Sequence, residues 1–125
     1  MAAVMRIETE LGFLPQDVSM SKCGYDIESS IPEHLRAESG ESLRFLEVKG
    51  RAKGADTVTI SRNEILTALN QPEQFILAIV EVDGDKTATT YLKKPFKNPP
   101  DFSLQSSTHS IPALLKNAET IFAQK

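Results

Sequence analysis

The chain has 125 residues, of which 40% are hydrophobic and 25% are charged, and its formal net charge is −3. These values predict a single globular domain over residues 1–125 and exclude a uniformly basic nucleic-acid-binding domain, so any contact with nucleic acid must be local. Cys23 is the only cysteine, which excludes an internal disulfide and a zinc site built from several cysteines. Because no signal peptide and no apolar run near the roughly 20 residues of a membrane span are found, we expect a cytoplasmic protein without membrane contact.

The N-terminal half predicts one helix followed by three strands. Val4, Ile7 and Leu11 fall on one stripe of a helix, which Gly12 is placed to end. The clearest strand is 43–49, an apolar run closed by a glycine. The other segments expected here are a connection over 15–21, strands over 25–29 and 57–60, a polar loop over 31–42 and a basic turn over 51–56.

The following segment predicts a second helix and a buried strand. Ser61 and Glu64 have the spacing of a capping box, and the helix that they begin must stop before Pro72. The almost continuous apolar run 75–82 is typical of a central strand buried on both faces. The remaining segments expected here are a turn over 83–85, a hairpin strand over 87–92 and a loop over 93–109.

The chain is predicted to finish with a third helix. Ser110 caps it, Pro112 lies in its first turn, and its apolar face extends to Phe122. The element order is then α-β-β-β-α-β-β-α. Strands at the centre and helices on the flanks predict the mixed α/β class, with a central mixed sheet.

Glu47 and Lys49 are candidate catalytic residues. They lie two residues apart on a predicted strand, so their side chains share one face. Leu46 and Val48 then point to the opposite, apolar face. A buried charge costs several kcal/mol unless it is paired or binds a metal. Asp26 lies on the preceding predicted strand, and pairing of the two strands would bring it to Glu47.

Two carboxylates and a lysine suit the metal-dependent hydrolysis of a phosphodiester. Mg²⁺ prefers oxygen ligands and keeps several waters, and we expect it, or Mn²⁺, as the cofactor. Asp26 and Glu47 would supply two ligands and the Val48 carbonyl a third. The ion would polarise the phosphate and lower the pKa of a bound water. Lys49 would position that water or offset the charge that develops in the transition state.

The triplet Glu47-Val48-Lys49 is uninformative when taken alone. With nine lysines and 17 acidic residues among 125, chance predicts about one acid-x-lysine triplet, and the chain has one. The alternative is a surface ion pair, which contributes only ~0–1 kcal/mol to stability. The apolar strand around the triplet, the glycine after it and the aspartate on the strand before it favour a site.

Three segments follow one another in a distinctive order: Gly24-Tyr25-Asp26-Ile27, Arg44-Phe45-Leu46-Glu47-Val48-Lys49-Gly50 and Thr59-Ile60-Ser61-Arg62-Asn63-Glu64. This order resembles the domain related to the C-terminal region of the plant protein NO VEIN, over most of the chain. That family is similar to the PD-(D/E)xK, or restriction-endonuclease-like, superfamily. The resemblance implies a restriction-endonuclease-like core and a metal-dependent nuclease. The proline of the superfamily name is absent, since Tyr25 precedes Asp26, but this substitution is tolerated across the superfamily.

Later segments extend the resemblance. They are Gly54-Ala55-Asp56-Thr57-Val58-Thr59, Leu69-Asn70-Gln71-Pro72 and Lys94-Pro95-Phe96. These resemble the version of the domain found at the C-termini of large bacterial helicase-like ATPases of superfamily 2. The resemblance implies that the chain is the C-terminal fragment of a longer protein whose upstream helicase or ATPase domain is its partner. The sequence itself contains no Gly-x-x-x-x-Gly-Lys-Ser/Thr phosphate loop.

The resemblance also assigns roles to single residues. Glu8 matches an acidic position that some superfamily members place on their first helix, and it is a further catalytic candidate. Asn63 and Glu64 match an Asn-Glu pair that opens the second helix, although capping alone explains Glu64. The residues implied as the nuclease core are Asp26, Glu47 and Lys49.

Two basic clusters are candidates for contacts with phosphates, which position a nucleic acid without reading its sequence. The first holds Lys49, Arg51 and Lys53, and the second holds Lys93, Lys94 and Lys97. Asn63 is a further candidate contact. Solvated surface is the alternative for each cluster.

Other residues have simpler interpretations. We expect Tyr25 and Phe45 to pack in the fold rather than to stack on bases. His34 and His109 lack neighbours at ligand spacing and are expected on the surface. The serines have no accompanying His/Asp arrangement, which argues against a serine hydrolase.

We therefore expect a Mg²⁺-dependent nuclease that acts on nucleic acid, in particular DNA, within a helicase-associated DNA-processing or defence protein. Two alternatives stay open at this point. A catalytically inactive module of the same fold would bind nucleic acid or a partner protein without holding a metal. A docking domain for the attached helicase would carry an exposed apolar patch.

Overall fold

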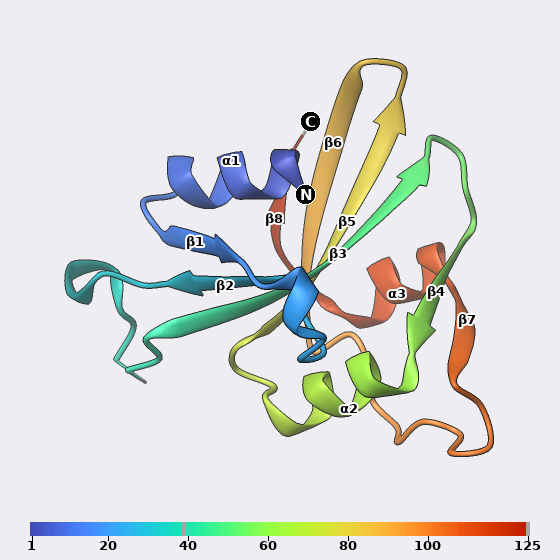
Figure 1. Ribbon diagram of the computed structural model, residues 1–125. Coiled ribbons are helices and arrows are strands. Elements are labelled where there is room, and N and C mark those ends of the chain that lie inside the picture. The colour runs from blue at the N-terminus through green and yellow to red at the C-terminus, as the bar shows by residue number, and fades with distance from the viewer. Residues whose placement is uncertain (39, 125) are drawn as a thin grey trace.

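The computed structural model describes residues 1–38 and 40–124. Over these residues it contains three α-helices and eight strands (Figure 1). The helices are α1 (Ala2–Glu10), α2 (Arg62–Asn70) and α3 (Ile111–Asn117). The strands are β1 (Leu14–Asp17), β2 (Ile27–Ser30), β3 (Leu43–Ala52), β4 (Thr57–Ser61), β5 (Phe75–Asp83), β6 (Lys86–Lys93), β7 (Ser106–Ser110) and β8 (Glu119–Ala123). Short 3₁₀ turns lie at Ser19–Ser21 and Glu33–Leu35.

Six of these strands form one mixed sheet in the order β1-β2-β3-β5-β6-β8. β3 and β5 run parallel to each other, and the other neighbouring pairs are antiparallel. β4 and β7 form a separate antiparallel pair. The mixed α/β class with a central mixed sheet is confirmed, and the arrangement is consistent with a restriction-endonuclease-like core.

The sheet has a hydrophobic core on each face. On one face, Val4 and Ile7 of α1 pack against Ile27, Leu46 and Tyr91. The opposite face is covered by α2, α3 and the β4–β7 pair, which lie together on one side of the sheet in Figure 1. β5 contributes to both cores, because its residues alternate between the two faces. The prediction of a central strand buried on both faces is confirmed.

The ends of the predicted helices α1 and α2 are confirmed to within a residue or two. α1 ends at Glu10, and Gly12 follows with φ +95°, a conformation that favours glycine. At α2 the capping box is complete, since Glu64 N donates to Ser61 Oγ and Ser61 N donates to Glu64 Oε1. α2 stops at Asn70, before Pro72.

Two strands lie where the sequence predicted a connection or a loop. β1 occupies the start of the expected connection over 15–21, and β7 lies inside the expected loop over 93–109. β1 is a short edge strand, and β7 is made of serine, threonine and histidine, so neither carries the apolar alternation of a half-buried strand. β1 is held by pairing with β2, and β7 by pairing with β4, which lies far away in the chain; periodicity does not detect such pairing.

The last helix was predicted too long. α3 ends at Asn117, and residues 119–123 form β8, which pairs with β6. Phe122 therefore lies on a strand, with its ring 5.1 Å from that of Tyr91. The β-branched pair Thr120-Ile121 favours a strand, and this preference outweighs the helical spacing of the apolar residues.

Two strand boundaries also differ from the prediction. β3 continues through Gly50 to Ala52, because it pairs residue by residue with β5 up to Ala52 and Val82. β2 begins at Ile27, so Asp26 directly precedes the strand. No helix among the described residues is long and apolar enough to cross a membrane.

Candidate functional site

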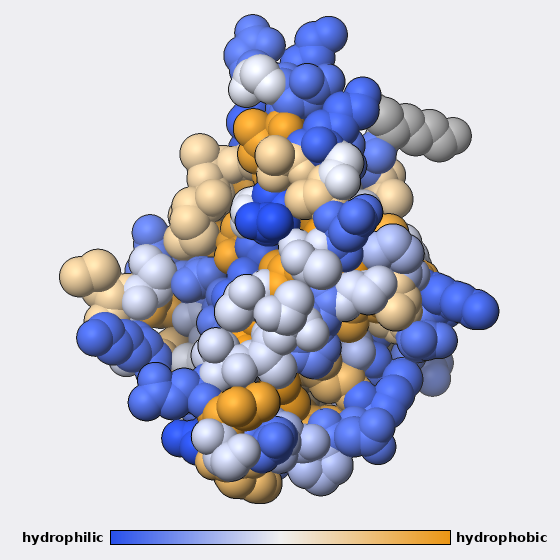
Figure 2. Space-filling model, turned by 90° about the vertical axis from the view of Figure 1, so that its right-hand side faces the viewer, coloured by the Kyte–Doolittle hydropathy of each residue, from blue (hydrophilic) through white to orange (hydrophobic). Residues whose placement is uncertain are grey.

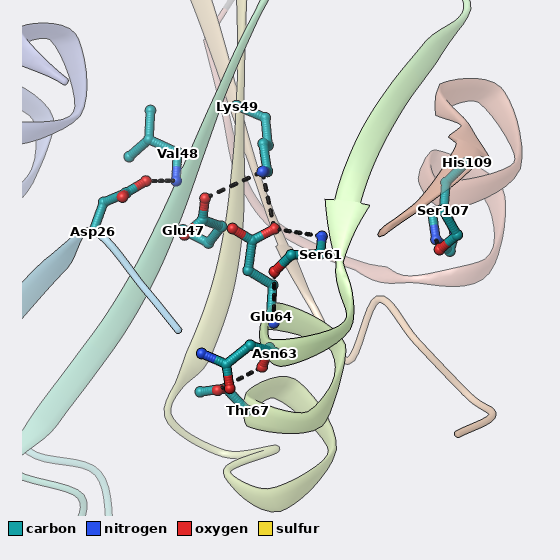
Figure 3. A network of polar contacts seen from close by, with 10 residues as sticks. All are labelled: Asp26, Glu47, Val48, Lys49, Ser61, Asn63, Glu64, Thr67, Ser107 and His109. Carbon is teal, nitrogen blue, oxygen red and sulfur yellow. Dashed lines mark hydrogen bonds and ion pairs between the residues drawn. The ribbon is translucent and has the colours of Figure 1, made fainter. Parts of the chain in front are cut away.

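A small polar pocket of about 240 Å³ lies where the loop before β2 meets β3 and the start of α2. Asp26 and Glu47 reach it from the sheet, and Asn63 and Glu64 reach it from the helix (Figure 3). The residues that line it are Ser19, Lys22, Gly24, Tyr25, Asp26, Glu47, Ser61, Asn63 and Glu64. The pocket therefore brings together side chains that are up to 45 positions apart, from Ser19 to Glu64.

The carboxylate of Asp26 is fixed by backbone contacts with β3. Its Oδ2 accepts a hydrogen bond from Val48 N at 2.9 Å, and its own amide donates to Leu46 O at 2.8 Å. β2 stops pairing with β3 at Leu46, so Asp26 satisfies a strand donor that β2 no longer reaches. One carboxylate oxygen is used in this way, and the side chain still lines the pocket.

Gly24 sets how closely the loop before Asp26 approaches α2. A Cβ atom at this position would lie 2.2 Å from Thr67 Oγ1, and the φ angle is +94°. Both the space and the backbone conformation therefore require glycine. Thr67 is held in turn, because its hydroxyl donates to Asn63 O at 2.8 Å. One wall of the pocket is thus formed where this loop packs tightly against the first two turns of α2.

Glu47 is the most buried carboxylate of the pocket, with 5% of its surface exposed. It stands on the face of the sheet that α2 covers, beside Leu77 in the register of β3 and β5. Burial raises the pKa of Glu47 to about 9, and repulsion from Glu64 and Asp26 adds to the shift. The Lys49 ammonium lowers the pKa of Glu47, but this effect is smaller than the effects of burial and repulsion. Without a bound cation, Glu47 is therefore protonated at neutral pH.

Lys49 lies between two carboxylates. Its Nζ is 3.4 Å from Glu47 Oε2 and 2.9 Å from Glu64 Oε1 (Figure 3). The pKa of Glu64 is lowered despite its partial burial, because the Ser61 amide and the Lys49 ammonium stabilise its charged form. The pKa of Lys49 is raised by the same ion pairs, against the effect of its burial. The ion pair at neutral pH therefore joins Lys49 to Glu64 more strongly than to Glu47.

The expectation that Asp26, Glu47 and Lys49 lie together agrees with this geometry. Glu64 joins them; the sequence favoured a capping role for it and left open a role in the site through the match to an Asn-Glu pair. The signal for its second role was its place in the first turn of the helix that follows β4, next to Asn63. Ser19 and Lys22 also line the pocket and were not expected there.

Glu8 does not reach the pocket. It is fully buried on the opposite face of the sheet, where its Oε1 accepts a hydrogen bond from Arg44 Nε at 2.8 Å and its Oε2 one from Arg44 Nη2 at 3.1 Å. The Arg44 guanidinium also lies over the ring of Phe13, 4.3 Å from its centroid. The structure therefore gives Glu8 a structural ion pair and does not group it with Asp26 and Glu47.

The two basic clusters are largely engaged by neighbouring groups. The Nζ atoms of Lys93 and Lys94 lie 3.5 and 3.3 Å from the Glu73 carboxylate, and none of these three residues lines the pocket. Lys53 lies 3.6 Å from Asp83. Arg51 donates to Thr57 O at 2.9 Å. Among the candidates for nucleic-acid contact, only Asn63 lines the pocket itself.

Tyr25 and Phe45 pack as expected. Their rings are stacked, with centroids 4.5 Å apart, and the Tyr25 hydroxyl donates to Glu28 Oε1 at 3.2 Å. Burial raises the pKa of Tyr25 to about 12, and Cys23 and Glu28 act in the same direction. This stack supports the loop that carries Asp26.

His109 is a correction to the sequence interpretation. It is half-buried rather than on the surface, and its Nε2 lies 2.7 Å from Ser107 Oγ (Figure 3). Both residues line a cavity of about 360 Å³ between β7, α3 and the loop before β7. Burial lowers the pKa of His109. Over the described residues His109 has no carboxylate partner, so this pair does not complete the triad of a serine hydrolase.

The pocket suits a cation that needs few protein ligands. Among the described residues, no three histidine, cysteine, aspartate or glutamate side chains form a group able to hold a metal ion. Mg²⁺ needs only one or two carboxylates, because waters and substrate phosphates complete its coordination. Asp26 and Glu47 supply two, and the repulsion that raises the pKa of Glu47 is what a bound cation would relieve. The donors therefore fit Mg²⁺ or Mn²⁺ and do not fit a closed zinc site.

Comparison with known proteins adds one finding. The family model described as "Protein NO VEIN, C-terminal" matches residues 1–92. The chain belongs to the NO VEIN C-terminal family. No curated protein and no solved structure matches the sequence. The NO VEIN C-terminal match includes α1, α2 and β1 to β5, and hence every residue that lines the polar pocket.

Proposed function

We propose that this NO VEIN C-terminal domain is a Mg²⁺-dependent nuclease whose site is the polar pocket. The observation that carries the proposal is the arrangement of Asp26, Glu47 and Lys49 in and beside one pocket. Two carboxylates and an ammonium group meet there although Asp26 and Glu47 lie on separate segments of the chain. The resemblance of the sequence to the restriction-endonuclease-like superfamily also supports metal-dependent hydrolysis of a phosphodiester.

Each residue has a defined role in this proposal. Asp26 and Glu47 would hold the cation, and the Val48 carbonyl would be a third ligand, since the Val48 backbone lies against Asp26. The bound cation supplies Lewis-acid polarisation of the phosphodiester and lowers the pKa of a water. The Lys49 ammonium stabilises the negative charge that develops on the phosphate oxygens. A water oxygen would form a bond to phosphorus, the bond from phosphorus to one sugar oxygen would break, and the proton lost by the water would end on that sugar oxygen.

The test is cleavage of DNA by the purified protein with and without Mg²⁺. We expect Asp26→Ala and Lys49→Ala to abolish Mg²⁺-dependent cleavage while the circular dichroism spectrum stays unchanged. Lys116→Ala is the matched control, because Lys116 is an exposed lysine on α3 outside the pocket. If Lys49→Ala cleaves at the rate of the control variant, the assignment is wrong. RNA and single-stranded DNA, tested in parallel, define the substrate.

A second candidate is a module of the same fold that binds a partner without cleavage. The ion pairs of Lys53, Lys93 and Lys94 with acidic neighbours favour it, because they reduce the positive charge available to phosphates. Met20, on the loop beside the pocket, is 91% exposed and offers an apolar contact. On the face shown in Figure 2, hydrophobic residues lie in separate patches among polar ones, as is ordinary for a protein surface. Calorimetric titration with Mg²⁺ separates the two candidates, since a binding module need not hold a metal.

A further inference from the structure

The contact between Glu64 and Lys49 links the start of α2 to the sheet. Lys49 Nζ lies closer to Glu64 Oε1, at 2.9 Å, than to Glu47 Oε2, at 3.4 Å. Both side chains are mostly buried, with 21% of Lys49 and 16% of Glu64 exposed. An ion pair in such a site is screened by water much less than a surface pair. The position of the ammonium group therefore depends on a residue of the helix.

The Glu64 carboxylate is itself held in place. Its Oε1 accepts the Ser61 amide at 2.9 Å, and the Glu64 amide donates to Ser61 Oγ at 3.1 Å. One oxygen atom thus receives both the helix cap and the lysine. A lysine side chain has four rotatable bonds and loses considerable rotamer entropy when it is ordered. A carboxylate fixed by the Ser61 amide, on a residue whose own amide is held by the Ser61 hydroxyl, can order the lysine with little further loss.

The same helix also contacts the loop that carries Asp26. Gly24 lies so close to Thr67 that no side chain fits between them. α2 therefore touches both halves of the site, through Thr67 on the side of Asp26 and through Glu64 on the side of Lys49. A shift of the helix would move Lys49 relative to the carboxylates.

We propose that Glu64 is a positioning residue that orients the Lys49 ammonium beside Glu47, so that the first turn of α2 is part of the nuclease site. The expected effect on cleavage rests on the proposed function. The ordering of the Lys49 side chain rests only on its ion pair with Glu64. In this proposal Glu64 does not bind the metal; Asp26 and Glu47 are the ligands. It acts through Lys49, so its loss reduces turnover and leaves substrate binding largely intact.

The experiment compares two variants that separate the cap from the ion pair. Glu64→Gln keeps a carbonyl oxygen for the Ser61 amide, since glutamine also serves in a capping box, but it removes the charge. Ser61→Ala breaks the cap from the other side and keeps the carboxylate for Lys49. We expect Glu64→Gln to lower kcat by about 10- to 100-fold with less than about a 3-fold change in KM. Ser61→Ala should lower Tm by about 3–6 °C and, because Ser61 also lines the pocket, should lower kcat somewhat, but much less than Glu64→Gln does.

A second measurement does not depend on activity. Relaxation of the Lys49 ε-methylene group, measured by NMR, reports how ordered the side chain is. We expect this group to be ordered in the wild type and in Ser61→Ala, and mobile in Glu64→Gln. If the wild type cleaves nothing, the proposed function fails, and the relaxation data still decide the role of Glu64. Unchanged order and unchanged kcat in Glu64→Gln would overturn the inference, as would an equal loss of kcat in Ser61→Ala.

Discussion

The Asp26 carboxylate and the Val48 amide are joined by a 2.9 Å hydrogen bond at the point where β2 stops pairing with β3. This contact gives Asp26 a structural role alongside its proposed catalytic one. The two roles depend on different properties of the side chain. The hydrogen bond needs an acceptor oxygen, whereas metal binding needs the negative charge.

Substitutions at Asp26 should separate these roles. We expect Asp26→Asn to keep the hydrogen bond and the stability but to lose at least about 100-fold in Mg²⁺-dependent cleavage. Asp26→Ala should lose cleavage and also about 1–3 kcal/mol of the free energy of unfolding, because the Val48 amide is left without its partner. Urea denaturation and cleavage assays on both variants measure the difference. Wild-type cleavage by Asp26→Asn would show that its charge is not needed.

The raised pKa of Glu47 predicts a pH-dependent stability. Its value of about 9 in the folded protein lies above the 4.5 of an ordinary glutamate, so the folded state favours the neutral form. The stabilisation is complete below pH 4.5 and is lost as the pH rises towards 9. We expect Glu47→Gln to be as stable as the wild type at pH 4 and more stable by about 1–3 kcal/mol at pH 8. Urea denaturation at pH 4, 6 and 8 tests this, and an equal difference at each pH would contradict it.

Cation binding should release the proton of Glu47. Because Glu47 is protonated at neutral pH without a cation, a metal that uses its carboxylate must displace that proton. We expect the affinity for Mg²⁺ to rise between pH 6 and 9, with about one proton released for each ion bound at pH 7. Calorimetry in buffers of different ionisation enthalpy counts this proton. Glu47→Gln serves as the control, and proton release that persists in it would assign the effect to another group.

Glu8 should matter for stability and not for cleavage. Removing one partner of a buried ion pair leaves the other charge uncompensated, which costs about 3–5 kcal/mol. We therefore expect Glu8→Ala to lose this much of the free energy of unfolding, since Arg44 keeps its place on the inner face of the sheet. Glu8→Leu combined with Arg44→Leu should lose less. If either folded variant is defective in cleavage at low temperature, Glu8 has a role that its distance from the pocket does not explain.

The central elements of the fold could be predicted because their signals are local. The apolar run of β5 and the Ser61–Glu64 capping box each lie within a few residues, and both are confirmed. The strands β1, β7 and β8 could not be predicted, because their structure depends on partners elsewhere in the chain. β7 is the clearest case, since its polar residues are held as a strand by β4.

The candidate site was predictable to a similar degree. The two-residue spacing of Glu47 and Lys49 fixed their common face, and the order of strands brought Asp26 near them. The ion pair of Lys49 with Glu64 could not be inferred, because it depends on how α2 packs against the sheet. The separation of Glu8 from the pocket could not be inferred either, since a helix can cover either face and the sequence does not state which.

The location of the pocket has a consequence for how such chains diverge. Every residue that lines it lies between Ser19 and Glu64, whereas α3 and β8 follow after residue 110 and contribute no lining residue. Exposed positions of α3 and β8 can therefore accept substitutions that keep Leu114 buried, whereas β7 pairs with β4 up to Ser61 and so borders the pocket. A library randomised in the exposed positions of residues 111–123 would vary a surface that does not line the pocket. Such a division is a starting point for redirecting the domain to new partners.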